Sequence, residues 1–171
     1  MAIDKSAQLR PLVLDASVAI NLLATEQPWK ILAALQFCAH VPEQVLDEVG
    51  RCPVTRRHYD EAKHPFRISP NVKVVTLSSA EIEHFVDVAQ YVGDGEAASI
   101  ALALSRGLPL ALDDRRARTI ALQRDASARL IWTTELLRDR ALAAAFSKDD
   151  IEGFFSAAIK HARMYVPKQD G

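Results

Sequence analysis

The sequence predicts an α/β domain in which helices cover a parallel sheet. Short apolar runs alternate along the chain with segments of helical periodicity, which is the pattern of parallel α/β proteins. Two of these runs end on carboxylates: 12–14 is followed by Asp15, and 110–112 by Asp113 and Asp114. In open parallel sheets, ligands bind beyond the carboxyl ends of the strands. The sequence therefore predicts an acidic site at that edge of the sheet.

The composition indicates one folded unit of ordinary globular type. The chain has 171 residues, of which 49% are apolar and 25% charged. The net charge of −1 gives no overall attraction to nucleic acid, so any such affinity must come from a local patch. Cys38 and Cys52 form neither a metal-binding spacing nor a disulfide framework, and the first ten residues do not resemble a signal peptide. We expect a cytoplasmic protein with no membrane partner.

Five strands and the helices between them follow from the periodicity. The expected strands are 12–14, 39–42, 72–77, 108–112 and 129–133. The expected helices are 17–23, 28–37, 43–51, 79–92, 97–106, 115–124, 135–146 and 149–163. The interval 52–71 has no periodicity and is expected to be an excursion or a mobile flap. Residues 11–134 form the predicted α/β unit, and 135–171 a helical extension packed on the same domain.

Helix capping can be predicted at several points. Ser17 is expected to cap the first helix, and Asp94 is a candidate cap of the helix that follows it. Ser78 with Glu81 has the form of a capping box, and Ser147 with Asp150 is similarly placed.

Acidic residues gather at the predicted strand ends and helix starts. They are Asp15, Glu48, Asp94, Glu96, Asp113 and Asp114. Carboxylates a few ångströms apart repel one another and raise one another's pKa, unless a cation compensates. Ligands that are all oxygen suit Mg²⁺ or Mn²⁺.

Such a site is suited to hydrolysis of a phosphodiester, in which a divalent cation activates water. Nucleotide binding is disfavoured, because the chain contains neither G-x-x-x-x-G-K-[ST] nor G-x-G-x-x-G. A phosphatase of the haloacid dehalogenase type needs a second Asp two residues after the nucleophile, whereas Asp15 is followed by Ala16 and Ser17. Hydrolysis of a phosphodiester remains the favoured chemistry.

Four motifs, in order along the chain, resemble those of the PIN-domain nucleases, and in particular the VapC-like toxin ribonucleases of bacterial toxin–antitoxin pairs. The motifs are LDAS at 14–17, VLDEV at 45–49, GEAASIALA at 95–103 and LDDRRAR at 112–118. The resemblance covers about residues 11–134. It implies a three-layer α/β/α fold with a five-stranded parallel sheet of order 3-2-1-4-5. It also implies a metal-dependent endoribonuclease that leaves 5′-phosphate and 3′-hydroxyl ends, forms a homodimer and is inhibited by an antitoxin.

By this resemblance Asp15, Glu48 and Glu96 occupy the first three acidic positions, and Asp114 or Asp113 the fourth. Asp15, Glu96 and Asp114 (or Asp113) would bind Mg²⁺ or Mn²⁺, and Glu48 would orient or deprotonate the attacking water.

Simpler roles are open for many of these residues. Asp15 can cap a helix, as can one of Asp113 and Asp114, and Glu48 has Asp47 and Glu43 as local rivals. Ser17, Thr133 and Asp94 are candidates to support the ligands through hydrogen bonds. The basic residues near the acids either contact RNA phosphates or lie on solvated helix faces; they are Arg51, Arg115, Arg116 and Arg118. A zinc site at His58 and His64 is disfavoured, since no cysteine or carboxylate accompanies them. The main alternative function is a non-catalytic module that binds RNA or protein.

Overall fold

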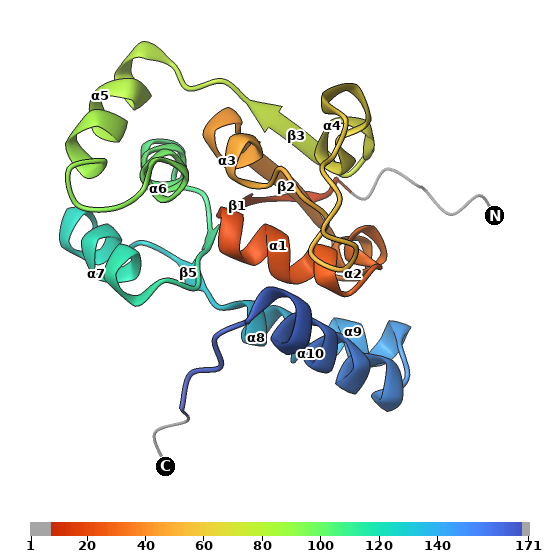
Figure 1. The fold of residues 1–171 in the computed structure, drawn as a ribbon. Coiled ribbons are helices and arrows are strands. Elements are labelled where there is room, and N and C mark those ends of the chain that lie inside the picture. The colour runs from red at the N-terminus through yellow and green to blue at the C-terminus, as the bar shows by residue number, and fades with distance from the viewer. Residues whose placement is uncertain (1–7, 169–171) are drawn as a thin grey trace.

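The computed structural model describes residues 8–168, and its core is a five-stranded, all-parallel sheet of order β3-β2-β1-β4-β5 (Figure 1). The strands are β1 (Arg10–Leu14), β2 (Phe37–Pro42), β3 (Val72–Val75), β4 (Leu110–Ala111) and β5 (Leu130–Ile131). The predicted α/β class and strand order are confirmed.

Ten α-helices are found among the described residues. They are α1 (Ala16–Ala24), α2 (Pro28–Ala34), α3 (Glu43–Glu48), α4 (Pro65–Ile68), α5 (Ser79–Val88), α6 (Asp94–Arg106), α7 (Arg115–Arg124), α8 (Thr133–Leu137), α9 (Arg140–Ala145) and α10 (Lys148–Ala162). Helices α5, α6 and α7 lie together on one side of the ribbon, and α1, α2, α8, α9 and α10 on another (Figure 1). Apolar side chains of the first group form one core cluster, and those of the second group belong to the other.

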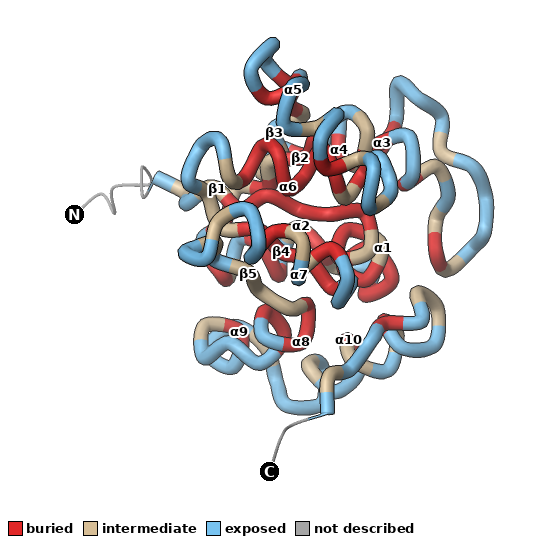
Figure 2. The backbone as a smooth tube through the Cα atoms, turned by 90° about the vertical axis from the view of Figure 1, so that its left-hand side faces the viewer, coloured by how far each residue is buried: buried red, intermediate tan, exposed pale blue. Residues whose placement is uncertain are grey.

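The central strand β1 contributes to both core clusters. Leu12 and Leu14 belong to the cluster with α1 and α10, whereas Val13 belongs to the cluster with α6 and α7. All three side chains are fully buried, and Figure 2 shows the strand among the buried segments at the centre of the molecule. A strand that is buried on both faces requires a continuous apolar run, which is the pattern that made β1 predictable.

The pairing of β1 with β4 positions the acidic edge. Val13 pairs with Leu110 and Leu14 with Ala111, and the Asp15 N–H donates to the Ala111 carbonyl at 3.1 Å. Asp15 therefore leaves the sheet beside the segment that carries Asp113 and Asp114.

Two predicted helix starts are wrong. Asp15, not Ser17, is the N-cap of α1, because its side chain accepts a hydrogen bond from the Ser17 N–H. Gly93, not Asp94, is the N-cap of α6, and Asp94 is the first helical residue. The capping boxes at Ser78 and Ser147 are confirmed.

Several predicted ends also differ from the structure. The helix expected over 43–51 ends at Glu48, and that over 79–92 ends at Val88. The helix expected over 135–146 is divided into α8 and α9, because Asp139 accepts a hydrogen bond from the Ala141 N–H at 2.8 Å and caps a second helix. The strand expected over 129–133 ends at Ile131, and Thr133 begins α8 instead.

The interval 52–71 is less irregular than expected. It contains the 3₁₀ helix Glu61–Lys63 and α4, whose Phe66 side chain is 1% exposed in the core. Nε2 of His64 lies 2.6 Å from the Val49 carbonyl oxygen, and its Nδ1 accepts from the Phe66 N–H. Both ring nitrogens of His64 thus take part in hydrogen bonds with the backbone, so neither is available to bind zinc. The segment 50–59, which leads into this interval, follows the exposed periphery in Figure 2 and has one antiparallel bridge, between Arg51 and His58.

Within residues 8–168, no helix combines the length and the apolar character that crossing a membrane requires.

Candidate functional site

Four of the predicted acids lie within electrostatic range of one another at the carboxyl edge of the sheet. They are Asp15, Glu48, Glu96 and Asp114, referred to below as the acid cluster. Burial first, and then the negative charges of Asp15, Asp114 and Glu48, together raise the pKa of Glu96 to about 7. Burial likewise raises the pKa of Asp15 to about 6, against the lowering effect of hydrogen bonds from Ser17. The cluster therefore holds its negative charge at a cost.

Asp15 divides its two carboxylate oxygens between different roles. Oδ2 accepts hydrogen bonds from the Ser17 hydroxyl at 2.7 Å and from the Ser17 N–H at 3.2 Å, which caps α1. Oδ1 is buried and has no hydrogen-bond partner, and the residue as a whole is 1% exposed. A buried carboxylate oxygen without a partner is unfavourable, so this atom is the part of the site that most needs a positively charged ligand.

The two glutamates rest on the first turn of α6. Oε1 of Glu48 accepts a hydrogen bond from the Gly95 N–H at 2.8 Å, and Oε2 of Glu96 accepts one from the Gly93 N–H at 3.2 Å. The free amides and the dipole of a helix N-terminus favour such anions. A Cβ atom on residue 95 would lie 2.6 Å from Oε1 of Glu48, so the close approach of this carboxylate requires glycine.

The adjacent acids Asp113 and Asp114 have different environments. Asp113 is 7% exposed; its Oδ1 accepts from the Thr133 N–H, and its Oδ2 accepts from the Thr133 hydroxyl and from Nδ2 of Asn21, each at 2.7 or 2.8 Å. Burial still raises the pKa of Asp113 above its ordinary value. Asp114 is exposed and uses only Oδ1, which accepts from the Ala117 N–H and caps α7. Both oxygens of Asp113 therefore accept hydrogen bonds, whereas Asp114 keeps Oδ2 without a partner among the described residues and lines two hollows together with Glu96.

The basic residues near the cluster separate into packed and open ones. The Arg118 guanidinium lies 3.8 Å from the centre of the Trp132 ring and donates to the Leu112 carbonyl at 2.8 Å, which fixes the end of β4. Arg116 is exposed and lines a hollow that also contains Glu96 and Asp114. Arg51 lines another hollow, beside Glu48.

A family model described as a PIN domain matches residues 11–129, more than half of the chain. The chain belongs to the PIN domain family. PIN domains are generally nucleases, so membership supports hydrolysis of a nucleic acid in general terms. Comparison with curated proteins gives no match.

The residues expected to support the acids of this PIN domain differ in placement. Ser17 contacts Asp15 and Thr133 contacts Asp113, whereas Asp94 is exposed, and no hydrogen bond among the described residues joins it to an acid. Asn21, which the sequence reasoning missed, is 3% exposed and donates to Asp113 and to Thr133. The signal was present: Asn21 is a polar residue on the otherwise apolar face of α1.

The donor set of the PIN domain site fits a hard divalent cation. It consists of carboxylate oxygens, one of which, Oδ1 of Asp15, is buried without a partner. As the side chains stand, no group of three His, Cys, Asp or Glu residues within 8–168 is close enough to hold an ion. Glu48 and Glu96 each accept one hydrogen bond at the start of α6, through Oε1 and Oε2 respectively, so their side chains would have to move closer to Asp15 to share a cation with it.

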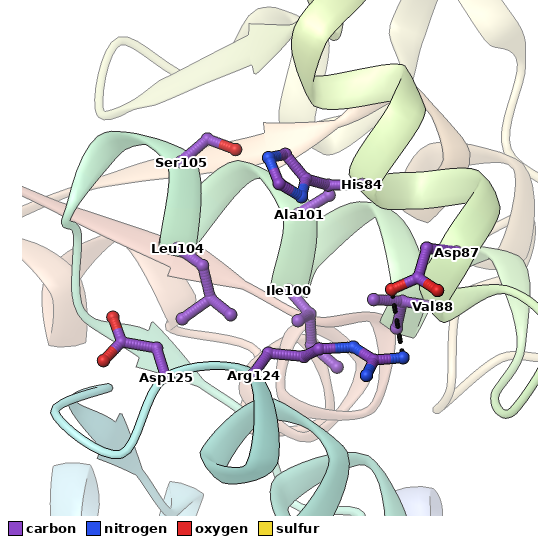
Figure 3. Close-up of a pocket in the computed structure, with 9 residues that line it drawn as sticks. All are labelled: His84, Asp87, Val88, Ile100, Ala101, Leu104, Ser105, Arg124 and Asp125. Atoms are coloured by element: carbon purple, nitrogen blue, oxygen red, sulfur yellow. Dashed lines mark ion pairs between the residues drawn. The ribbon is translucent and has the colours of Figure 1, made fainter.

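A separate pocket of about 300 Å³ lies between α5, α6 and α7 and contains none of the acid cluster (Figure 3). Its polar side includes the ion pair between Arg124 and Asp87 at 3.0 Å, which is the dashed contact in the figure. Its other side is formed by Val88, Ile100 and Leu104. Because these residues belong to the core cluster around α6 or pack against it, we treat the pocket as a packing feature.

Proposed function

We propose that this PIN domain is an endoribonuclease that depends on Mg²⁺ or Mn²⁺. The observation that carries the proposal is the acid cluster at the carboxyl edge of the sheet, with Oδ1 of Asp15 buried and unpaired. A site that keeps several carboxylates together without a basic partner is suited to a divalent cation and to phosphodiester hydrolysis.

The environments suggest a role for each acid. Asp15, Glu96 and Asp114 would hold the cation, because Asp15 has a free buried oxygen and the other two line the adjoining hollows. A bound divalent cation would supply an activated water and would neutralise charge on the phosphate. Glu48 is exposed and would orient the attacking water or accept its proton. Asp113 would position the edge through Asn21 and Thr133, and it is the alternative fourth ligand.

The open arginines would contact the RNA backbone. Arg116 and Arg51 lie in hollows beside the acids, and Arg115 is exposed at the start of α7. Arg118 is assigned to packing, because its guanidinium already contacts Trp132 and the Leu112 carbonyl.

The deciding experiment is cleavage of a labelled, structured RNA by purified protein with Mg²⁺, with Mn²⁺ and with EDTA, beside Asp15→Ala and beside DNA of the same sequence. Cleavage of RNA that needs the metal and disappears in Asp15→Ala supports the proposal. If a folded wild-type protein binds RNA and cleaves none under any metal, the protein is instead a non-catalytic binding module. Preferential cleavage of the DNA would overturn the RNA specificity.

On the resemblance of its motifs to the toxin ribonucleases, we extend the proposal to a homodimeric toxin inhibited by a protein antitoxin. Induced expression should then arrest growth, and Asp15→Ala should relieve the arrest. Light scattering on the purified protein measures whether it is a dimer. Growth unaffected by an active nuclease would remove the toxin role and leave the nuclease.

A further inference from the structure

The segment that follows α10 forms one side of a hollow in the candidate active site. A cavity of about 310 Å³ is lined both by acids of the sheet edge (Glu96, Asp113 and Asp114) and by Arg163 and Tyr165 of this segment. The Arg163 side chain is exposed, and none of the ion pairs found among residues 8–168 involves it. Arg163 thus lines the same cavity as Glu96 and Asp114, two acids of the cluster.

Contacts with α10, with Arg56 and with the aromatic and basic residues near β5 and α7 hold residues 161–165 in place. The Met164 N–H donates to the Ala158 carbonyl at 3.1 Å, and the Met164 side chain is 6% exposed in the core. The Arg56 guanidinium donates to the His161 carbonyl at 3.1 Å. The Tyr165 ring lies 5.7 Å from that of Trp132, and the Arg115 guanidinium lies 5.0 Å from the centre of the Tyr165 ring. These contacts fix the point from which the Arg163 side chain leaves the backbone.

The conformation of Arg163 is one that usually favours glycine. Its φ of 56° and ψ of 40° lie in the left-handed region, and it is the C-cap of α10. The hydrogen bond from the Met164 N–H to the Ala158 carbonyl completes this helix end. The helix end needs this conformation but has no need of a guanidinium, and glycine would adopt it with less strain. The cap of α10 therefore does not explain why residue 163 carries a guanidinium.

A second hollow adjoins the same acids and contains another exposed arginine. Glu96 and Asp114 line both hollows; one contains Arg163 and the other Arg116. The acids thus lie between two cavities, each with one exposed arginine.

We infer that Arg163 contacts a backbone phosphate of the RNA on one side of the scissile bond, with Arg116 placed to contact the strand on the other side. The inference rests on the proposed function. Four carboxylates repel a polyanion, so a strand that crosses them needs cations on both flanks. Arg163 is thereby a positioning residue for the substrate that lies outside the segment matched by the PIN domain family model.

The test measures how tightly the full chain binds a labelled single-stranded RNA in EDTA. Fluorescence anisotropy gives the binding constant at each of a series of salt concentrations. Arg163→Gly keeps the left-handed helix end and removes the guanidinium, so it should fold with an unchanged or higher Tm. We expect it to weaken binding about three- to tenfold and to reduce the slope of log K against log salt by about 0.7. Arg163→Lys should retain most of the affinity.

Arg140→Gln is the matched control, since Arg140 is also exposed and belongs to the C-terminal helices but lines none of the hollows described above. It should leave affinity and slope unchanged. Arg163→Asn, which also tolerates the left-handed conformation, should reproduce the loss. Wild-type affinity and slope in both Arg163→Gly and Arg163→Asn would overturn the inference, as would the absence of RNA binding by wild type. Binding that depends on Arg163 without any metal-dependent cleavage would overturn the nuclease proposal alone.

Discussion

Replacing Asp15 by Asn should stabilise the metal-free protein. Asn keeps an oxygen that can accept the Ser17 hydrogen bonds, so the cap of α1 is preserved. It removes a charge whose burial raises the pKa of Asp15 from its ordinary value of 3.8 to about 6. At about 1.4 kcal/mol for each pKa unit, this difference corresponds to an upper limit of about 3 kcal/mol in the free energy of unfolding at pH 7.

The sign of the effect fixes its pH dependence. Between pH 4 and 6 the folded wild type binds more protons at Asp15 than the unfolded chain does, so its stability falls as the pH rises through this window. Glu96 acts in the same direction up to about pH 7, because its pKa is raised to about 7. The advantage of Asp15→Asn should therefore be near zero at pH 4 and reach its full size above pH 6.

Urea denaturation in EDTA, at intervals from pH 4 to 8, measures this difference. Asp139→Asn is the matched control, since Asp139 also caps a helix but is exposed, and its replacement should change the free energy of unfolding less than Asp15→Asn does at pH 7.5. Added Mg²⁺ at about ten times its Kd should stabilise wild type by about 1.4 kcal/mol and the Asn variant by less. The reasoning is refuted if Asp15→Asn is less stable than wild type at pH 7.5 in EDTA, or if the difference shrinks as the pH rises.

Three further changes test the structure around the acids. Gly95→Ala should displace the Glu48 carboxylate and lower cleavage about 10- to 100-fold with an unchanged circular dichroism spectrum; full activity would show that this contact is dispensable. Thr133→Val removes the hydroxyl that donates to Asp113 and should lower the free energy of unfolding by about 1–3 kcal/mol in urea, whereas no change would assign that role elsewhere. Arg118→Lys loses a planar stack and a carbonyl contact, so scanning calorimetry should show Tm lowered by about 2–6 °C; an unaltered Tm would mean that charge alone suffices.

The elements buried on both faces were the most predictable part of the fold. The run that became β1 is apolar without interruption, so it could be predicted as a central strand without knowledge of its neighbours. Helix ends were less predictable. Where two nearby polar residues can each cap a helix, tertiary contacts decide which of them does. Ser17 and Asp15 are both good caps in isolation, and Asp15 takes the role while Ser17 donates to it.

The sequence indicated which acids lie together at the edge of the sheet, but it did not indicate their hydrogen-bond partners. Glu48 is one of several acids on its helix, and its distinguishing feature is the Gly95 amide, which lies 47 residues later in the sequence. Arg163 follows a helix expected to be an extension of the domain, and only the path of the chain after α10 brings it to the cavity. Contacts of this kind arise from the packing of distant segments, so no local pattern in the sequence indicates them.

The C-terminal helices are connected to the site at both of their ends, which argues against treating them as a simple addition. Thr133, the first residue of α8, holds Asp113 through its N–H and its hydroxyl, and Asn21 of α1 joins the same carboxylate. At the other end, the chain leaving α10 presents Arg163 to the cavity beside Asp114. Because α10 also packs on α1, whose N-cap is Asp15, a displacement of the C-terminal helices would move both Asp15, the proposed metal ligand, and Arg163, the proposed RNA contact. Activity should therefore be more sensitive than global stability to changes at the contact between α1 and α10.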